Sequence, residues 1–370
     1  MTANLIDLGT PEGFSGLPLT GSGAASAAFS FDAGSAQAAA SGRIAMIGVN
    51  EAGGDFGTNV PGVLGVDYTY PTDAEINYEI SRGMNTIRIP FLAERIAANS
   101  SGVLSQTLLA PFNAIVSYAT SQGLTVILDD HDYGKYFGQT LGLGTAADGQ
   151  FATFWANLAK YFAGNKHVVF GLNNEPHYQT PLQWESAAQK AVTAIRAAGA
   201  TQPILVSGAY YDSASNWYEE ANGNSANTNA AALLLLKDPK NNLIYDVHNY
   251  LDPNNTGTGP ATSTTLGASR LHAVTAWALS NHVKLFLSET GSTTDTLSLT
   301  ALDNELNYVA ANPTAWMGVT EWAAGPWWGN YNYSLEPTTE VVNGVTSYVD
   351  KPQMAQLETF APHYAGSPWT

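Results

Sequence analysis

The chain has 370 residues, of which 45% are hydrophobic and 12% are charged; it can bury a large core, and this composition excludes a disordered chain. Its formal net charge is -17 with 14 Lys and Arg, which excludes a nucleic-acid or anionic-membrane surface because both need clustered cations, and which fits a neutral substrate. There is no Cys, so disulfides and thiolate metal sites are excluded, and no run of about 18 apolar residues that would span a bilayer.

The first 42 residues are rich in Gly, Ala and Ser and show little helical periodicity. We predict an irregular N-terminal arm over residues 1–42, with a short hairpin around residues 28–31. The opening MTANLIDLG has no basic region followed by an apolar one, so any signal peptide has been removed or was never present. Residues 43–370 are predicted to form one further domain, without a linker or an appended module.

Short apolar and β-branched segments then recur along the chain, which predicts eight strands. They lie at Ile44–Val49, Thr86–Pro90, Thr125–Leu128, Val168–Leu172, Pro203–Val206, Leu243–Val247, Lys284–Leu287 and Trp316–Val319. Between them, helices are predicted at Ala74–Arg82, Ser105–Gln122, Asp148–Ala163, Pro181–Ala198, Thr264–Ser280 and Leu299–Ala311. The first four of these helices are each followed by Gly, a common helix terminator.

An alternation of strand and helix is typical of parallel α/β proteins. Eight such strands predict the α/β class and a single closed (β/α)8 TIM barrel preceded by the irregular arm. The alternative is a doubly wound open sheet, which usually carries a phosphate-binding glycine loop directly after a strand. The only near match, Gly142–Ala147, follows a loop instead, and neither a P-loop nor a G-x-S-x-G motif occurs.

Polar residues lie within or just after six of the predicted strands, toward the end where a barrel carries its chemistry. They are Arg88, Asp129–Tyr133 with His131, Asn174 with Glu175, His248 with Tyr250, Glu289, and Glu321 with Trp322. A purely structural explanation would need six separate buried polar networks at one rim. For single residues other interpretations stay open: Arg88 in a structural ion pair, His131 with its Asp neighbours at a metal, and Tyr250 or Trp322 in the core.

Two glutamates on different strands, Glu175 and Glu289, are typical of glycoside hydrolysis. That reaction needs one carboxylic acid to protonate the leaving oxygen and a second carboxylate to attack the sugar or to activate water. The separation of the two carboxylates distinguishes retention from inversion, and the sequence does not give this separation.

The motifs Asn174-Glu175-Pro176, His248-x-Tyr250 and Ser288-Glu289-Thr290-Gly291 together resemble glycoside hydrolase family 5, from about Ile47 to the C-terminus. Further stretches that carry the resemblance are Ile47–Asn50 with Asp55–Gly57, Phe170–His177, Asp246–Asp252 and Leu285–Gly291. Among the branches of this family of retaining (β/α)8 glycosidases, the chain looks most similar to fungal and bacterial endo-β-1,4-glucanases (cellulases).

The resemblance implies a double displacement on internal β-1,4-glucosidic bonds of a β-glucan, with no cofactor and no metal. Glu175 is then the general acid and base, and Glu289 is the nucleophile. Tyr250 and Arg88 are expected to hydrogen-bond to Glu289 and to keep it ionised.

The same resemblance assigns the remaining site residues. Asn174 is expected to hold the 2-hydroxyl of the reacting sugar, and Trp322 to form the floor beneath it. His131 and His248 are expected to contact sugar hydroxyls or the catalytic carboxylates.

The stretch from Gly325 to Lys351 is too long for an ordinary loop after a strand, and we expect it to form one wall of the substrate cleft. Within it, Trp327 and Trp328 are candidates for stacking on sugar rings, although one of them could merely pack the loop down.

The alternatives on the same catalytic residues are a β-glucosidase or transglycosylase, or a mixed-linkage glucanase, mannanase or xyloglucanase. A non-catalytic carbohydrate-binding barrel is a further alternative, which would have no use for both glutamates. The polymeric substrate predicts secretion, and the residues leave the oligomeric state open.

Overall fold

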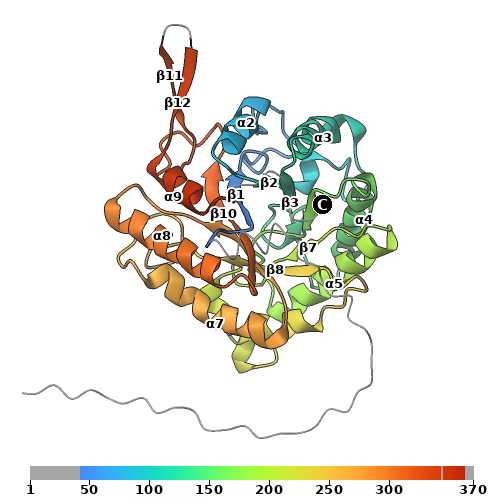
Figure 1. Cartoon of the computed structure of the whole chain (residues 1–370). Coiled ribbons are helices and arrows are strands. Elements are labelled where there is room, and N and C mark those ends of the chain that lie inside the picture. The colour runs from blue at the N-terminus through green and yellow to red at the C-terminus, as the bar shows by residue number, and fades with distance from the viewer. Residues whose placement is uncertain (1–41, 343–344, 363–370) are drawn as a thin grey trace, which may run out of the picture. The chain divides into compact units, whose positions relative to one another are not determined.

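The computed structural model describes residues 42–342 and 345–362 (Figure 1). Eight parallel strands close into a barrel in the order β1-β2-β3-β6-β7-β8-β9-β10, with β10 paired back onto β1. They are β1 (Met46–Glu51), β2 (Thr86–Phe91), β3 (Thr125–Asp130), β6 (Val168–Gly171), β7 (Ile204–Val206), β8 (Leu243–His248), β9 (Leu285–Thr290) and β10 (Trp316–Ala324). The predicted (β/α)8 barrel is confirmed. Apart from Gly42, the predicted N-terminal arm lies outside the described residues.

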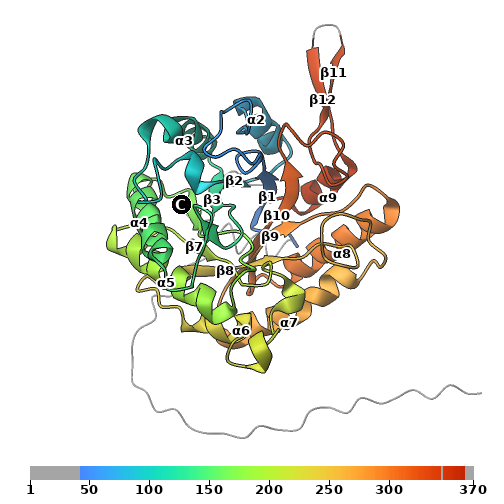
Figure 2. The ribbon, with the colours of Figure 1, turned by 180° about the vertical axis from the view of Figure 1, so that it is seen from behind.

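Six helices between the strands correspond to the six predicted ones and surround the barrel (Figures 1 and 2). They are α2 (Asp73–Ser81), α3 (Gln106–Ser121), α4 (Ala146–Tyr161), α5 (Pro181–Ala197), α7 (Leu266–Asn281) and α8 (Thr296–Ala311). Helix α8 begins three residues before its predicted start, because Asp295 caps it by accepting hydrogen bonds from the amides of Leu297 and Ser298. Within the described ranges, no helix is both long enough and hydrophobic enough to cross a bilayer.

Several short elements were not predicted. They are the hairpin of β4 (Lys135–Tyr136) and β5 (Gln139–Thr140), the helices α6 (Asn229–Ala232) and α9 (Pro352–Phe360), the hairpin of β11 (Thr338–Val342) and β12 (Val345–Val349), and the 3-10 turns η1 (Ala93–Arg95), η2 (Ala214–Asn216), η3 (Ala221–Gly223) and η4 (Leu233–Leu235). Most are too short, or too polar, to show a periodic pattern of hydrophobic residues.

The β11–β12 hairpin extends beyond the ring of helices (Figures 1 and 2). It is tied to α2, since the ring of Tyr348 lies 4.9 Å from that of Tyr78, and the following Asp350 accepts hydrogen bonds from Tyr78 and Arg82. The expectation that the whole stretch from Gly325 to Lys351 lines the cleft is therefore wrong for the hairpin, which packs on the outside of the barrel.

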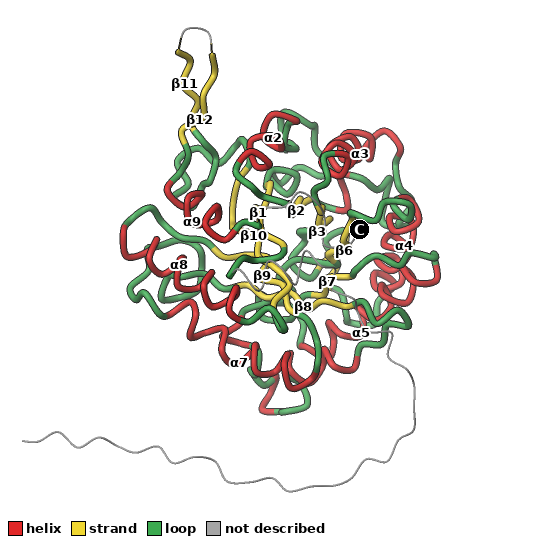
Figure 3. The backbone as a smooth tube through the Cα atoms, viewed as in Figure 1, coloured by secondary structure: helices red, strands yellow, loops and turns green. Residues whose placement is uncertain are grey.

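The strands form the barrel wall in the middle of the domain, and the helices surround it (Figure 3). The amino-terminal part of the barrel interior is filled by one apolar layer, consisting of Met46, Ile127, Val169, Leu205, Ile244, Phe286 and Met317. A larger hydrophobic cluster fills the space between the strands and the helices. Because side chains alternate between the two faces of a strand, the inward positions further along the strands can carry polar groups without disturbing either core.

Candidate active site

Eight of the ten predicted site residues lie together at the carboxyl end of the barrel. Arg88 projects from β2, His248 from β8, Glu289 from β9 and Trp322 from β10, while the other four follow the ends of strands; these are His131, Asn174, Glu175 and Tyr250. Hydrogen bonds, ion pairs and ring contacts connect all eight into one network with Glu289 at its centre.

The carboxylate of Glu289 is buried and accepts two short hydrogen bonds. Nη1 of Arg88 donates to Oε1 across 2.8 Å, and the hydroxyl of Tyr250 donates to Oε2 across 2.6 Å. Burial alone would raise the pKa of Glu289, but the positive charges of His248 and Arg88, with smaller contributions from His131 and Tyr250, lower it to about 2. Glu289 is therefore an ionised carboxylate held in one orientation.

Arg88 is a buried cation whose guanidinium is shared among four residues. Besides Glu289, Nη1 donates to Oδ1 of Asn50 at 2.8 Å, and Nη2 donates to Oδ1 of Asn174 at 2.6 Å and lies 3.1 Å from Oδ2 of Asp129. Two carboxylates thus compensate one buried charge, as a buried cation requires. Asn50 and Asp129 were not among the predicted site residues, although both end a predicted strand and so carry the signal that identified the others.

His131 connects Asp129 to Asn174 and Trp322. Its Nδ1 lies 2.7 Å from Oδ2 of Asp129, and its Nε2 lies 3.2 Å from Nδ2 of Asn174. The imidazole is stacked against the indole of Trp322, with the ring centres 5.2 Å apart and the planes at 15°. Across the described part of the chain, no group of residues close enough to hold a metal ion includes His131. Its contacts with Asp129, Asn174 and Trp322 fix the orientation of the imidazole ring.

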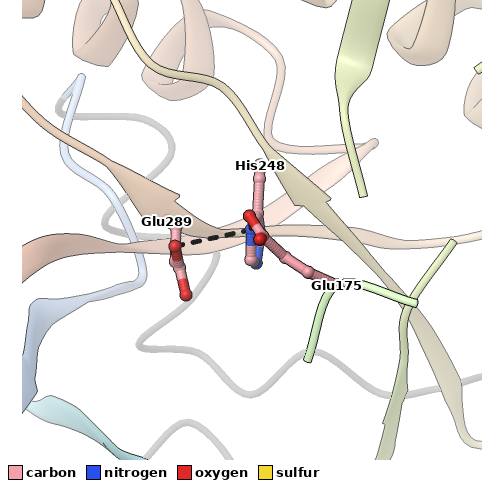
Figure 4. Close-up of side chains that lie close together, drawn as sticks. All are labelled: Glu175, His248 and Glu289. Carbon is pink, nitrogen blue, oxygen red and sulfur yellow. Dashed lines mark hydrogen bonds and ion pairs between the residues drawn. The ribbon is translucent and has the colours of Figure 1, made fainter. Parts of the chain in front are cut away.

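Glu175 is the more exposed of the two glutamates, with 17% of its side chain accessible against 4% for Glu289. Its Oε1 lies 2.9 Å from Nδ1 of His248, and the same nitrogen lies 3.5 Å from Oε2 of Glu289 (Figure 4). One carboxylate oxygen of each glutamate and one nitrogen of the imidazole all lie within 4.8 Å of one another.

His248 is surrounded by acceptors. Its Nε2 lies 3.0 Å from Oγ of Ser288, 3.8 Å from Oδ2 of Asp212 and 3.9 Å from Oδ2 of Asp246. Burial would lower the pKa of His248, but the negative charges around it, of which Glu289 has the largest effect, raise it to about 10. An imidazolium therefore stands between the two glutamates at neutral pH.

Two carboxylates, one ionised and buried on β9 and one partly exposed after β6, are the groups that glycosidases use. A sequence model described as cellulase (glycosyl hydrolase family 5) matches residues 49–325. The chain belongs to glycosyl hydrolase family 5. It is a glycoside hydrolase.

Relatives in this family cover most of the chain. Endoglucanase gh5-1 of Neurospora crassa is 37% identical over 329 residues, which make up 88% of this chain and 79% of that protein. Endo-beta-1,4-glucanase B of Aspergillus niger is 36% identical over 292 residues, or 78% of this chain and 84% of that protein.

Solved structures of the family superpose on the barrel. The structure of XacCel5A in complex with cellopentaose has a TM-score of 0.80 and 39% identity, and covers 86% of this chain and 99% of that chain. An endo-beta-1,4-glucanase from Xanthomonas axonopodis pv. citri has a TM-score of 0.81 and 36% identity, with the same two coverages.

The family 5 site opens into a cleft of about 660 Å³ on the side of Glu175. Besides Glu175, His248 and Tyr250, it is lined by two loops, one at residues 210–216 after β7 and one at residues 253–256 after β8. These loops were not predicted as part of the site, because they carry no motif and only the closure of the barrel brings them beside Glu175.

The two tryptophans after β10 differ in their surroundings. Trp328 is packed against Phe56, Trp322 and Tyr331, and its Nε1 donates to the carbonyl oxygen of Ala324 at 2.8 Å. Trp327 has 41% of its surface exposed and, within the described segments, stacks on no other aromatic ring. Trp328 therefore holds the loop in place, while the indole of Trp327 is accessible to a ligand.

Proposed function

We propose that this family 5 hydrolase is a retaining endo-β-1,4-glucanase, which cleaves internal β-1,4-glucosidic bonds of cellulose-type glucans by double displacement. The observation that carries the proposal is the placement of carboxylate oxygens of Glu175 and Glu289 within 4.8 Å of each other. Carboxyl groups about 5–5.5 Å apart are typical of retaining glycosidases, whereas inverting enzymes need about 6.5–9.5 Å to accommodate a water.

In the first step, an oxygen of Glu289 attacks the anomeric carbon from the face opposite the leaving group. The bond between that carbon and the glycosidic oxygen breaks, and the protonated Glu175 transfers its proton to the departing oxygen. The products are a covalent glycosyl ester on Glu289, a shortened glucan with a free hydroxyl, and an ionised Glu175.

In the second step, the ionised Glu175 removes a proton from a water molecule as the water oxygen attacks the anomeric carbon. The ester bond breaks, Glu289 recovers its negative charge, and the sugar leaves with its original configuration. His248 contacts both carboxylates, so its positive charge stabilises whichever of them is ionised in each step.

The remaining predicted residues support these steps. Arg88 and Tyr250 keep Glu289 ionised and aimed, which supports its assignment as the nucleophile. Asn174 is fixed between Arg88 and His131 and is assigned the 2-hydroxyl of the reacting sugar. Trp322, stacked on His131, is assigned the floor beneath that sugar, and the exposed Trp327 an outer platform.

The relatives support the substrate class, since they are named endo-beta-1,4-glucanases and one solved neighbour holds cellopentaose. A polymeric glucan cannot enter a cell, and we therefore propose that the protein is secreted. Detection of the native protein only in the cytosol would contradict secretion.

The stereochemical outcome tests the mechanism. Proton NMR of cellotetraose or cellopentaose during hydrolysis should show the β-anomer of the new reducing end before mutarotation equilibrates it. Appearance of the α-anomer first would mean inversion, and the double displacement would be wrong.

The bond specificity is tested by product profiles on carboxymethyl-cellulose, barley glucan, glucomannan and cello-oligosaccharides. Endo-cleavage should yield cellobiose and cellotriose with an early fall in viscosity. Steady release of glucose alone would indicate a β-glucosidase, and a clear preference for barley glucan or glucomannan would indicate a mixed-linkage glucanase or a mannanase.

The nucleophile is tested with Glu289→Gln, which keeps the shape of the side chain. We expect kcat to fall by roughly 10⁴-fold or more, with cello-oligosaccharide binding retained in calorimetry. A variant that keeps its activity would disprove the assignment of Glu289, and loss of activity from a protein that no longer binds would point to misfolding.

A further inference from the structure

Glu175 has an unusual backbone conformation for its residue type. Its φ angle is +45°, in the left-handed region that non-glycine residues seldom occupy. Such a conformation costs about 1–3 kcal/mol and persists only when the surroundings impose it. Pro176 follows Glu175, so the chain cannot relax by extending β6.

Asp212, in the loop between β7 and η2, is the side chain that holds this backbone. Its Oδ2 accepts a hydrogen bond from the amide of Glu175 across 3.1 Å, and the carboxylate is fully buried. Its carbonyl oxygen accepts a second hydrogen bond, from the amide of His248 at 2.9 Å. One residue therefore anchors the main chain of Glu175 and the main chain of the histidine that contacts the Glu175 carboxylate.

The loop that carries Asp212 is itself built in an uncommon way. Tyr210, Tyr211 and Asp212 have consecutive φ angles of +60°, +64° and +54°, and none of them is glycine. The amide of Tyr211 also donates to the carbonyl oxygen of Pro176 at 3.4 Å, so the loop contacts the segment after Glu175 at a second point. Three consecutive non-glycine residues in the left-handed region are uncommon, and this loop places the Asp212 carboxylate at the amide of Glu175.

The Asp212 carboxyl group also lies close to the side chain of His248. Its Oδ2 lies 3.8 Å from Nε2 of His248, and its Oδ1 has no hydrogen-bond partner among the described residues. A buried carboxyl oxygen without a partner lowers the stability of the fold. A purely stabilising role therefore does not account for Asp212.

We propose that Asp212 is a positioning residue, which fixes Glu175 at the angle and distance from which it protonates the leaving glycosidic oxygen. This inference rests on the proposed role of Glu175 as the general acid and base. Asp212 acts through the backbone of Glu175 and through His248, and it does not touch the substrate.

Leaving-group dependence separates this role from a structural one. When a cello-oligosaccharide is cleaved, the departing sugar oxygen is a poor leaving group and needs a proton. In contrast, 2,4-dinitrophenolate departs without one. We expect Asp212→Ala to lower kcat/KM on cellotetraose by about 10- to 100-fold, since a small misplacement of a catalytic group has effects of this size. On 2,4-dinitrophenyl β-cellobioside, its effect on the first step should be less than about threefold.

Asp212→Asn tests the hydrogen bond separately from the charge. Its side-chain oxygen can still accept from the amide of Glu175, so we expect activity on cellotetraose within about threefold of wild type. If Asp212→Ala does not fold, Asp212→Leu keeps a side chain branched at Cγ without an acceptor and should show the same dependence on the leaving group. The matched control is Asp238→Ala, because the side chain of Asp238 is also buried but pairs with Arg196. This variant should lower Tm and leave the ratio of kcat/KM on cellotetraose to kcat/KM on the dinitrophenyl substrate unchanged.

The outcomes distinguish the inference from the function on which it rests. Glu175→Gln should itself lower kcat/KM on cellotetraose far more than kcat/KM on the dinitrophenyl substrate. If Glu175→Gln affects both substrates equally, the acid role of Glu175 is wrong. If Glu175→Gln shows the dependence while Asp212→Ala lowers both rates equally or neither, the positioning role of Asp212 alone is wrong.

Discussion

Nη1 of Arg88 lies 2.8 Å from Oε1 of Glu289, although 201 residues separate the two along the chain. Both side chains are buried, and neither charge could be accommodated alone in the interior of the barrel. The ion pair therefore permits an ionised carboxylate at the end of β9, and it lowers the pH at which that carboxylate loses its charge.

The first prediction concerns the charge of Arg88. Its positive charge helps to lower the pKa of Glu289 to about 2, so Arg88→Met should raise that pKa. Because Glu289 must be ionised to attack, activity is lost as the pH falls through its pKa, and the acidic limb of the kcat/KM profile should move to higher pH. At neutral pH we expect kcat/KM to fall by at least about 10²-fold.

The pH profile on cellotetraose, from pH 3 to pH 8, measures this shift, because the wild-type limb near pH 2 lies below this range and the limb of Arg88→Met should move into it. The control is Arg82→Met, since Arg82 pairs with Asp350 on the outside of α2 and should leave the profile unchanged. An Arg88→Met profile that stays as flat as that of wild type down to pH 3 would refute the electrostatic role of Arg88.

Tyr250→Phe removes one hydrogen bond from Glu289 and keeps the aromatic ring. The lost bond is 2.6 Å long and helps to lower the pKa of Glu289, so kcat should fall by about 10- to 100-fold with KM little changed. Tyr333→Phe is the matched control, because its hydroxyl donates to the carbonyl oxygen of Gly259 and not to a catalytic residue. Equal losses in the two variants would show that the Tyr250 hydroxyl matters only for packing.

Glu51, at the end of β1, is a buried carboxyl group that the proposed mechanism does not use. Neither of its oxygens has a hydrogen-bond partner in the described ranges, and burial, with the nearby charge of Glu79, raises its pKa well above 4.5. A raised pKa in an acid means that folding is favoured at low pH and that this contribution is lost as the pH rises above about 4.5, the value for the unfolded chain.

Glu51→Met replaces this group by an apolar side chain of similar size. We expect the variant to be more stable than wild type by about 1–3 kcal/mol at pH 8, with a smaller gain at pH 4. Thermal unfolding between pH 4 and pH 9 measures the difference, and Glu219→Met on the exposed surface serves as the control. A gain that does not grow with pH would mean that the charge of Glu51 does not oppose folding.

The two tryptophans after β10 should respond differently to truncation. Trp327→Ala removes an exposed indole and should raise KM for cellopentaose severalfold, with little change in kcat or in Tm. Trp328→Ala removes an indole packed against Phe56 and Tyr331 and should destabilise the protein by about 3–5 kcal/mol at most. Steady-state kinetics and thermal unfolding of both variants test this division, and a normal KM in Trp327→Ala would exclude it as a sugar platform.

Much of the site could be predicted because its signals are local. Arg88, Glu175 and Glu289 each lie within an apolar run or within three residues of its end, where a polar residue stands out from the pattern of a strand. Asn50 has the same signal, but it belongs to no catalytic motif, and the sequence does not show that its side chain accepts a hydrogen bond from Arg88. Asp212 had no such signal, because it lies six residues beyond the end of β7 in a loop whose φ angles the sequence does not show.

By itself, the sequence determined that the chain forms a barrel, which residues end its strands, and which family it belongs to. Each of these follows from the order of neighbouring residues, through the alternation of strands and helices and through short motifs. Only the tertiary structure decided that Glu175 and Glu289 share one imidazole, that the hairpin of β11 and β12 lies away from the cleft, and that Asp212 reaches the amide of Glu175. These are contacts between distant segments, and they form only when closure of the barrel sets the register of all eight strands.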